Sequence, residues 1–305
     1  MTVSDRSGPR LHLVAFDHRR SLDAALLGLD PAAGRALDRL ATKHLIWRGV
    51  RRTLEVTDSA AVLVDADAGV ILDEARAAGV ATALALERSG QRWLALERSA
   101  LETQKLLDQH RPDYAKLLVR WHPSDPIDRQ HAQIDTMGAV STWAAGAGAR
   151  LMLELLVPPE GPDAARGTSD PDAYHDEILP IRLEESIRQL SAEGIVPAMW
   201  KIDGVARADA CAHVAAAVRD GSDGRAGIVV LGAGQDMDTV RSWFRATAGC
   251  PEFTGFAIGR NIWWDAVEGY VTGALSGDDA ERLIGDRFAE VVHCYRDAVG
   301  DTTAS

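Results

Sequence analysis

Pro197-Ala198-Met199-Trp200-Lys201-Ile202-Asp203-Gly204 is a short apolar run with one lysine inside it. The chain has 33 basic residues, and its only lysines are Lys43, Lys105, Lys116 and Lys201. Burying an unpaired ammonium costs free energy and lowers the pKa of the amine. A lysine of lowered pKa is the nucleophile that forms a Schiff base with a carbonyl compound. Taken alone, the run favours a strand-end lysine that reaches water along its apolar stem.

The same kind of apolar run recurs eight times and alternates with longer amphipathic stretches. We predict strands at residues 11–16, 61–64, 81–86, 115–119, 151–156, 198–202, 227–231 and 253–258. Helices are predicted at residues 32–55, 70–78, 101–109, 126–147, 178–192, 209–219, 236–248, 262–275 and 279–299. Regular alternation over about 250 residues predicts an α/β fold, a (β/α)8 TIM barrel. We expect one domain over residues 1–305, with the barrel at about 11–275 and an additional C-terminal helix at about 279–299.

A doubly wound open sheet is the alternative architecture. The segment after the first predicted strand argues against it, because Phe16-Asp17-His18-Arg19-Arg20 offers charges where a dinucleotide site needs glycines. Residues 158–172 are rich in Pro, Gly and Asp. Such a composition predicts a lid over the mouth of the barrel, not a domain boundary.

Composition restricts the partners and the compartment. The 305 residues are 46% hydrophobic and carry a formal charge of −12, which argues against nucleic acid and anionic membranes as partners. The three cysteines form no CxxC pair, so we expect a reducing cytoplasm. The N-terminus is polar, and no run approaches the length that spans a membrane. We expect a homo-oligomer that associates through the C-terminal helix.

In a (β/α)8 barrel, chemistry takes place at the C-terminal ends of the strands. Charged or glycine residues occupy these ends in nearly every predicted strand: Asp17, Asp65, Glu87 with Arg88, Lys116 with Arg120, Glu154, Lys201 with Asp203, Gly232-Ala233-Gly234, and Gly259-Arg260. Side chains two positions apart in a strand share a face. This parity groups Lys116 with Arg120, and Lys201 with Asp203, on single faces of their strands.

Glu154 interrupts Leu151-Met152-Leu153-Glu154-Leu155-Leu156, and a carboxylate buried there needs a partner. We predict that Glu154 faces a lysine across the barrel lumen and moves protons, although a structural ion pair with Lys116 is the alternative. Asp17 fits a cap and a site residue about equally. Asp65, Glu87 and Asp203 fit loop caps or ion-pair partners better, and His18 and His122 are read as loop residues.

The last two strands predict an anion site. Gly232, Gly234 and Gly259 provide backbone N–H groups, and Arg260 provides a guanidinium where a helix begins. Tight turns and an ion pair of Arg260 are the alternative. The nine histidines form no HxH or HExxH pair, so no metal or other cofactor is expected.

Five segments are similar to the class I aldolases around tagatose-1,6-bisphosphate aldolase: Val14 to Arg19, Ala115 to Val119, Leu153 to Leu155, Trp200 to Asp203 and Gly255 to Trp263. His122-Pro123-Ser124-Asp125-Pro126 and Trp200-Lys201 resemble more closely the DUF2090 branch, which includes the aldolase-like domain fused to 5-dehydro-2-deoxygluconokinase in inositol catabolism. The similarity covers about residues 11–275. It departs at Ile202-Asp203-Gly204, where relatives carry Val-Glu or Leu-Glu-Pro, and this departure bears on substrate identity.

The resemblance implies a carbon–carbon lyase of carbohydrate metabolism that cleaves a ketose phosphate, or a keto-deoxy sugar acid phosphate, into dihydroxyacetone phosphate and an aldehyde. It implies that Lys201 forms the Schiff base and that Glu154 is the acid/base residue. It further implies that Lys116 helps to lower the pKa of Lys201 and contacts substrate oxygens, and that Asp17 lies at the aldehyde or hydroxyl end of the substrate. Gly234, Gly259 and Arg260 are implied at the phosphate, and Gly232, Arg120, Asp203 and Glu87 are further candidate substrate contacts. A transaldolase or sulfosugar-phosphate aldolase, and a non-catalytic sugar-phosphate-binding barrel, are the alternatives.

Overall fold

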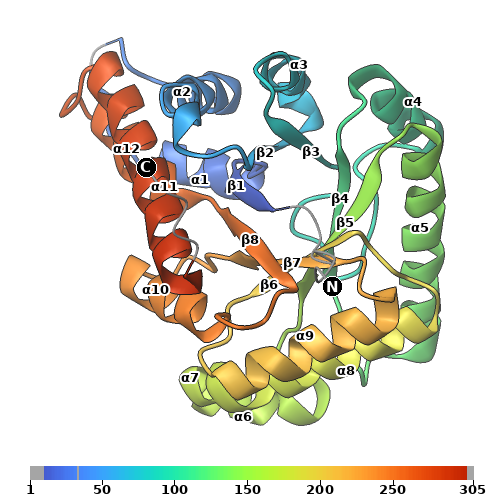
Figure 1. The fold of residues 1–305 in the computed structure, drawn as a ribbon. Helices are drawn as coiled ribbons and strands as arrows, with labels where there is room; N and C mark the ends of the chain where they lie inside the picture. The colour runs from blue at the N-terminus through green and yellow to red at the C-terminus, as the bar shows by residue number, and fades with distance from the viewer. Residues whose placement is uncertain (1–9, 33, 301–305) are drawn as a thin grey trace, which may run out of the picture.

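The computed structural model describes residues 10–32 and 34–300, in which eight parallel strands close into a barrel in chain order (Figure 1). The strands are β1 (Leu11–Ala15), β2 (Ala60–Asp65), β3 (Ala81–Ala85), β4 (Tyr114–Arg120), β5 (Arg150–Leu156), β6 (Met199–Asp203), β7 (Gly227–Leu231) and β8 (Phe253–Ile258). Each strand pairs with the next, and β8 pairs with β1. The predicted TIM barrel is confirmed, with every strand placed to within one residue at each end.

Helices surround the barrel on the outside (Figure 1). The longer ones are α1 (Arg20–Leu27), α2 (Arg39–Arg51), α3 (Gly69–Ala77), α4 (Ala100–His110), α5 (Ile127–Gly146), α8 (Leu179–Ala192), α9 (Ala208–Ser222), α10 (Met237–Ala246), α11 (Arg260–Val271) and α12 (Gly277–Val299). The additional C-terminal helix α12 packs against α2, α10 and α11. Its apolar residues, including Ile284 and Phe288, are buried there.

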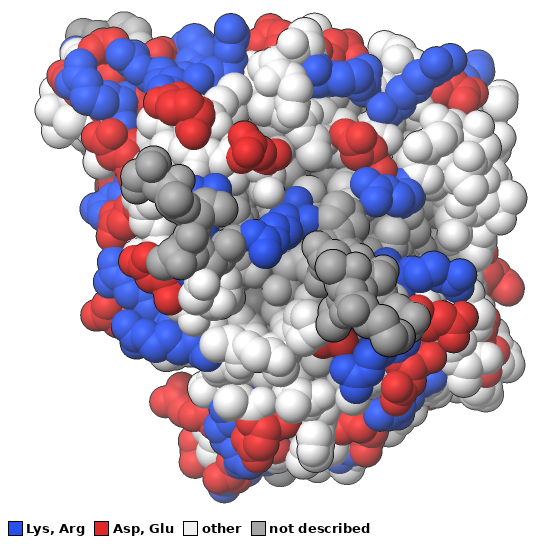
Figure 2. All heavy atoms as spheres, viewed as in Figure 1, with Lys and Arg blue, Asp and Glu red and all other residues white. Residues whose placement is uncertain are grey.

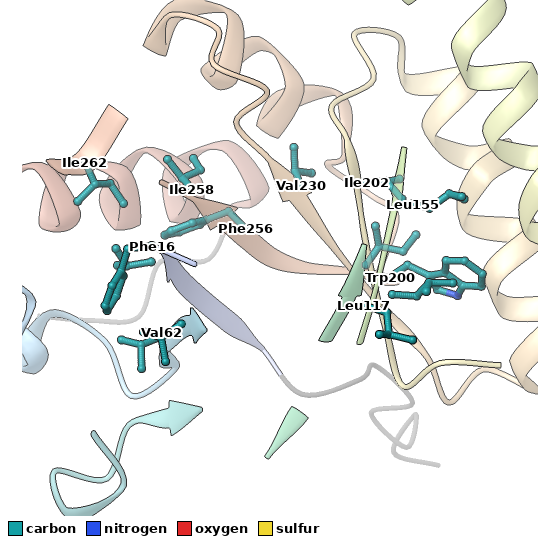
Figure 3. Close-up of a cluster of buried hydrophobic side chains, with 14 of the residues drawn as sticks. Phe16, Val62, Leu117, Leu155, Trp200, Ile202, Val230, Phe256, Ile258 and Ile262 are labelled. Carbon is teal, nitrogen blue, oxygen red and sulfur yellow. The ribbon is translucent and has the colours of Figure 1, made fainter. Parts of the chain in front are cut away.

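Two separate hydrophobic clusters explain why the strands read as continuous apolar runs. The larger lies between the strands and the helices, and Figure 3 shows part of it, with Phe16, Leu117 and Trp200 among the labelled side chains. The smaller consists of alternate residues from the strands, among them Leu13 and Met199. Because both faces of each strand are covered, apolar side chains occupy consecutive positions.

Two predicted segments differ from the structure. The helix predicted at residues 32–55 is shorter and begins after Asp38, whose carboxylate accepts a hydrogen bond from the N–H of Ala41 as an N-terminal cap. A short helix, α1, precedes it and was not predicted. The segment expected as a lid, residues 158–172, contains a 3-10 turn at Gly161–Asp163 and the short helices α6 (Ala164–Ser169) and α7 (Pro171–Ala173), followed by a π-helical turn at Tyr174–Ile178.

Charges of both signs are interspersed over the face seen in Figure 2, with uncharged surface between them. Many are close ion pairs on helix surfaces, such as Arg48 with Glu281 at 2.6 Å. Within the described ranges, no helix combines the length and the apolar character needed to cross a membrane. The homo-oligomer expected from the C-terminal helix stays a prediction, because α12 uses its apolar face within this chain.

Candidate functional site

Strand parity carries a set of charged side chains to one end of the barrel. The interior cluster contains Ala15 of β1, Ala85 of β3, Met152 of β5 and Met199 of β6. The residues two positions later in the chain, on the same face, are Asp17, Glu87, Glu154 and Lys201. Lys116 likewise lies two positions after Tyr114 in β4. The interior is therefore apolar at its lower end and charged at the C-terminal mouth.

Lys116 is the central cation of this mouth. Its side chain is 1% exposed, and its Nζ lies 2.9 Å from a carboxylate oxygen of Asp17, 2.9 Å from Glu87 and 2.6 Å from Glu154. Burial would lower the pKa of Lys116, but the three carboxylates outweigh it and raise that pKa well above its ordinary value. Lys116 is a fixed positive charge at neutral pH.

Lys201 shares Glu154 with Lys116. The Nζ of Lys201 lies 2.9 Å from Oε1 of Glu154, while Oε2 is the oxygen that contacts Lys116. Glu154 and Lys201 are Cα partners in the β5–β6 register. The expectation that they face one another across the lumen is therefore wrong: they are neighbours on adjacent strands, because β5 pairs directly with β6 and Glu154 lies opposite Lys201 in that pairing.

The carboxylates are also held away from their ordinary pKa values. Burial would raise the pKa of Glu154, but Lys116 and Lys201 outweigh it, and the pKa falls below the usual range. Burial likewise opposes ionisation of Asp17, yet the two lysines hold its pKa well below its usual value. Both side chains are anions at neutral pH, and both are held in ion pairs with lysine.

Two further buried carboxylates, Glu87 and Asp65, lie just after β3 and at the end of β2. Glu87 accepts hydrogen bonds from the N–H of Leu118 at 3.2 Å and from the guanidinium of Arg19 at 3.3 Å. Asp65, at the end of β2, pairs instead with Lys43 of α2, at 2.6 Å. The interpretation of Asp65 and Glu87 as ion-pair partners agrees with these contacts, and Glu87 also contacts Lys116.

Two cavities meet at Lys201 and Glu154. One, of about 330 Å³, extends toward the loop after β3 and is also lined by Lys116, Arg88 and Arg120. The guanidinium of Arg120 donates to the backbone oxygen of Gln91 at 2.7 Å. The other cavity, of about 440 Å³, extends toward the ends of β7 and β8. A ligand that spans both would pass directly over the amine of Lys201.

The second cavity ends at the predicted anion site. It is lined by the Gly232-Ala233-Gly234 turn, Gly259, Arg260 and Asn261. Gly234 has φ of 76°, and a Cβ there would lie 2.9 Å from the guanidinium of Arg260, so this position requires glycine. Gly259 caps α11 without a side-chain hydrogen bond, which leaves the first N–H groups of the helix available. Arg260 has no carboxylate partner within residues 10–32 and 34–300.

The sequence departure at Asp203 and Gly204 has a packing explanation. A Cβ at Gly204 would lie 1.9 Å from the indole of Trp243, so only glycine lets Trp243 pack there. The ring of His175 stacks on that indole, with centroids 5.3 Å apart. Burial raises the pKa of Asp203 to about 6, and the nearby His175 opposes this shift. Asp203 lines the same cavity as Lys201.

His18 lies in the loop after β1, as the sequence predicts, and joins the site. It lines both cavities beside Lys201 and packs edge-on against Trp263 at 5.5 Å between centroids. Its position directly after Asp17, at the end of a strand, was the available signal. His122 does not join it: its ring nitrogens contact Ser124 at 2.7 Å and Asp163 at 3.1 Å, which ties the β4–α5 loop to the segment after β5.

The described part of the chain holds no group of three or more His, Cys, Asp or Glu side chains arranged to bind a metal ion. The charges at the mouth form one network of ion pairs instead, in which Lys116 contacts three carboxylates and Glu154 contacts two lysines. What the arrangement offers chemically is a primary amine, a shared carboxylate, a fixed cation and, lining the same cavity as the amine, an arginine at a helix N-terminus.

Comparisons with known proteins place the chain in a family without assigning an activity. Residues 1–299 match the family described as "Uncharacterized protein conserved in bacteria (DUF2090)". No curated protein matches the chain. Among solved structures, a crystal structure of Cgl0159 from Corynebacterium glutamicum is similar, with 19% sequence identity and a TM-score of 0.54, covering 93% of this chain and 86% of that one. This similarity supports the fold alone.

Proposed function

The chain belongs to the DUF2090 family, and from its site we propose that it is a class I, Schiff-base-forming aldolase. The substrate would be a ketose phosphate, or a keto-deoxy sugar acid phosphate, and the products dihydroxyacetone phosphate and an aldehyde. The observation that carries this proposal is the pair of lysines on one carboxylate, with Lys116 at 2.6 Å and Lys201 at 2.9 Å from the two oxygens of Glu154.

The two lysines differ in how firmly they are held. Lys116 contacts three carboxylates, whereas Lys201 forms one ion pair among the described residues, with Glu154. Both lysines contact the same carboxylate, so Lys201 shares with Lys116 its only ion-pair partner among the described residues. Lys201 is the amine that can leave its ion pair and attack a carbonyl carbon, because Lys116 is anchored on three sides.

Attack of Lys201 on the ketone gives a carbinolamine, and loss of water gives an iminium ion. Glu154, which touches the amine, can accept and return the protons of these steps. The iminium then withdraws the electron pair of the neighbouring carbon–carbon bond as that bond breaks. An enamine remains on Lys201 and an aldehyde leaves. Lys116 stays charged throughout and stabilises the carboxylates around the reacting atoms.

The anion site would orient the substrate. Arg260 and the open N–H groups of α11 suit a phosphate. A phosphate held there would keep the ketone beside Lys201, so that binding energy far from the reacting bond accelerates the reaction. Arg88 and Arg120 line the opposite cavity, which would receive the aldehyde half.

The test is borohydride reduction in the presence of dihydroxyacetone phosphate, followed by mass spectrometry of the peptides. We expect one added three-carbon adduct, on Lys201. Lys201→Arg should remove the adduct, and the matched control Lys105→Arg, at an exposed position of α4, should retain it. Labelling of a different residue, or of none, would contradict the proposal. Thermal stabilisation by sugar phosphates without any adduct or cleavage would support the non-catalytic barrel instead.

A further inference from the structure

His18 is an imidazole at the reaction centre to which the steps above give no role. It follows Asp17 at the end of β1 and lines the cavities on both sides of Lys201. Its ring is positioned by packing, edge-on against Trp263 with an interplanar angle of 75°. The ring also lies against the backbone of Gly259, where a Cβ would be 2.7 Å from the oxygen of Ala15 and 3.1 Å from Cε1 of His18.

His18 also differs from Asp17 and Glu154, because within the described ranges no ion pair with a lysine occupies its ring. Its Nδ1 is buried and has no hydrogen-bond partner among the residues that the structure describes, which leaves Nε2 as the nitrogen on the cavity side. Glu154 has one oxygen on each lysine, and Asp17 is held by Lys116 at 2.9 Å. Once Lys201 is an iminium, its N–H⁺ still faces Glu154. A second proton acceptor is needed for the hydroxyl on the far side of the cleaved bond.

We propose that His18 is the general base for this hydroxyl, an inference that rests on the proposed aldolase function. In cleavage, the hydroxyl O–H bond breaks and its proton passes to Nε2 of His18. The O–H electron pair becomes the second C=O bond of the aldehyde. The carbon–carbon bond breaks, and its pair neutralises the iminium to give the enamine. Positive charge moves from the nitrogen of Lys201 to the ring, so the net charge of the site is unchanged.

The electrostatics of the site fit this exchange. Burial lowers the pKa of His18 to about 4; the charge of Asp17 opposes the shift, and the charges of Lys201 and Arg260 add to it. The ring is therefore neutral at pH 7 and able to accept a proton. Cleavage removes the charge at Lys201 in the same step in which the ring is protonated. One of the charges that disfavour the imidazolium is thus lost when the imidazolium forms.

The experiment compares His18→Gln with the unmodified protein in two assays on the same preparations. The first is borohydride trapping of dihydroxyacetone phosphate on Lys201. The second is the rate of cleavage of the ketose phosphate that the unmodified protein cleaves fastest in a panel of 1-phosphates and 1,6-bisphosphates. We expect His18→Gln to retain trapping, and to lose about 10²–10⁴-fold in kcat for cleavage. His131→Gln, at an exposed position of α5, is the matched control and should change neither assay.

A chemical rescue separates a proton acceptor from a packing residue. Added imidazole should restore part of the cleavage by His18→Ala, because it can occupy the vacated ring position, and it should not raise the activity of the control.

If the unmodified protein gives no adduct, or cleaves no member of the panel, the aldolase proposal fails and this inference with it. If the unmodified protein gives both, but His18→Gln cleaves at a similar rate, only the role of His18 is overturned. Loss of trapping in His18→Gln would also overturn it, since His18 would then act before the bond is cleaved.

Discussion

The Lys43–Asp65 pair and the cluster around Lys116 both bury a lysine beside carboxylates, and both lysines are 1% exposed. Their pKa values shift in opposite directions. Burial lowers the pKa of Lys43, because its partner Asp65 only partly offsets the loss of water. Three carboxylates more than offset the same burial at Lys116 and raise its pKa.

At these two lysines, the number of carboxylate partners decides the direction in which the pKa shifts. The difference also separates structural ion pairs from the proposed chemistry. Lys43 pairs with one oxygen of Asp65, and Lys43 is not among the described residues that line the two cavities at Lys201. Lys116 lines one of those cavities and shares Glu154 with Lys201.

The largest effect is expected from Lys116→Met. The substitution leaves Asp17, Glu87 and Glu154 close together without their common cation. We expect a loss of about 3–5 kcal/mol in the free energy of unfolding, since buried charges lose their partner. Turnover should fall by about 10²–10³-fold, as when a preorganised charge is removed from a reaction centre. Urea unfolding and cleavage kinetics measure the two effects.

Lys105→Met, at the exposed lysine of α4, is the control for Lys116→Met and should leave both quantities nearly unchanged. An unfolding free energy of Lys116→Met within about 1 kcal/mol of the unmodified protein would mean that the three carboxylates are protonated or separated in solution.

The next effect tests whether the Lys43 pair can be removed without loss of chemistry. Lys43→Met alone should lower the free energy of unfolding by about 3 kcal/mol, because Asp65 remains buried without its ammonium. Adding Asp65→Leu should return stability to within about 1 kcal/mol of the unmodified protein, since an apolar pair needs no desolvation of charge. Urea unfolding of both variants measures this recovery. Cleavage kinetics of the double variant should stay near those of the unmodified protein; a loss like that of Lys116→Met would show that the two regions are coupled.

The smallest effect is the alkaline pH dependence of stability. The folded state binds fewer protons at Lys43 than the unfolded chain does, in the range between its lowered pKa and about 10.4. Stability from this residue therefore rises with pH in that range. The folded pKa of Lys116 is raised, so its contribution is complete below about 10.4 and is lost only above it.

Unfolding free energies measured between pH 8 and pH 10 distinguish the two lysines. Lys43→Met should reduce the rise of stability over this range, whereas Lys116→Met should leave the rise unchanged. Equal slopes in the two variants would remove the contrast between the two lysines.

Much of the fold follows from local pattern. A strand covered on both faces must be apolar at consecutive positions, so Gly227–Leu231 and Phe253–Ile258 are recognisable from composition and length alone. Helix starts are less visible. Residues 32–38 have helix-like composition but precede α2, whose beginning depends on the cap at Asp38.

The sequence indicated which residues belong to the candidate site, but not all the contacts between them. Lys201, Glu154, Lys116 and Asp17 were identified because each is a charge at the end of an apolar strand, where burial demands a reason. The contact of Glu154 with Lys116 was weighed as an alternative, but the contact with Lys201 on the neighbouring strand was not expected, because it depends on strand register. The loop position of His18 was predicted correctly, but nothing in the sequence brings the residue next to Trp263 and Gly259.

The order of residues was enough to specify a barrel with charges at one end, since alternation of apolar strands with amphipathic helices has few other solutions. Which lysine is fixed and which is free to react depends on how many carboxylates surround each one. Asp17, Glu87 and Glu154 come from three different strands and converge on Lys116 only when the barrel closes. Electrostatic energies depend on distances through space, and distances between residues far apart in the chain exist only in the folded molecule.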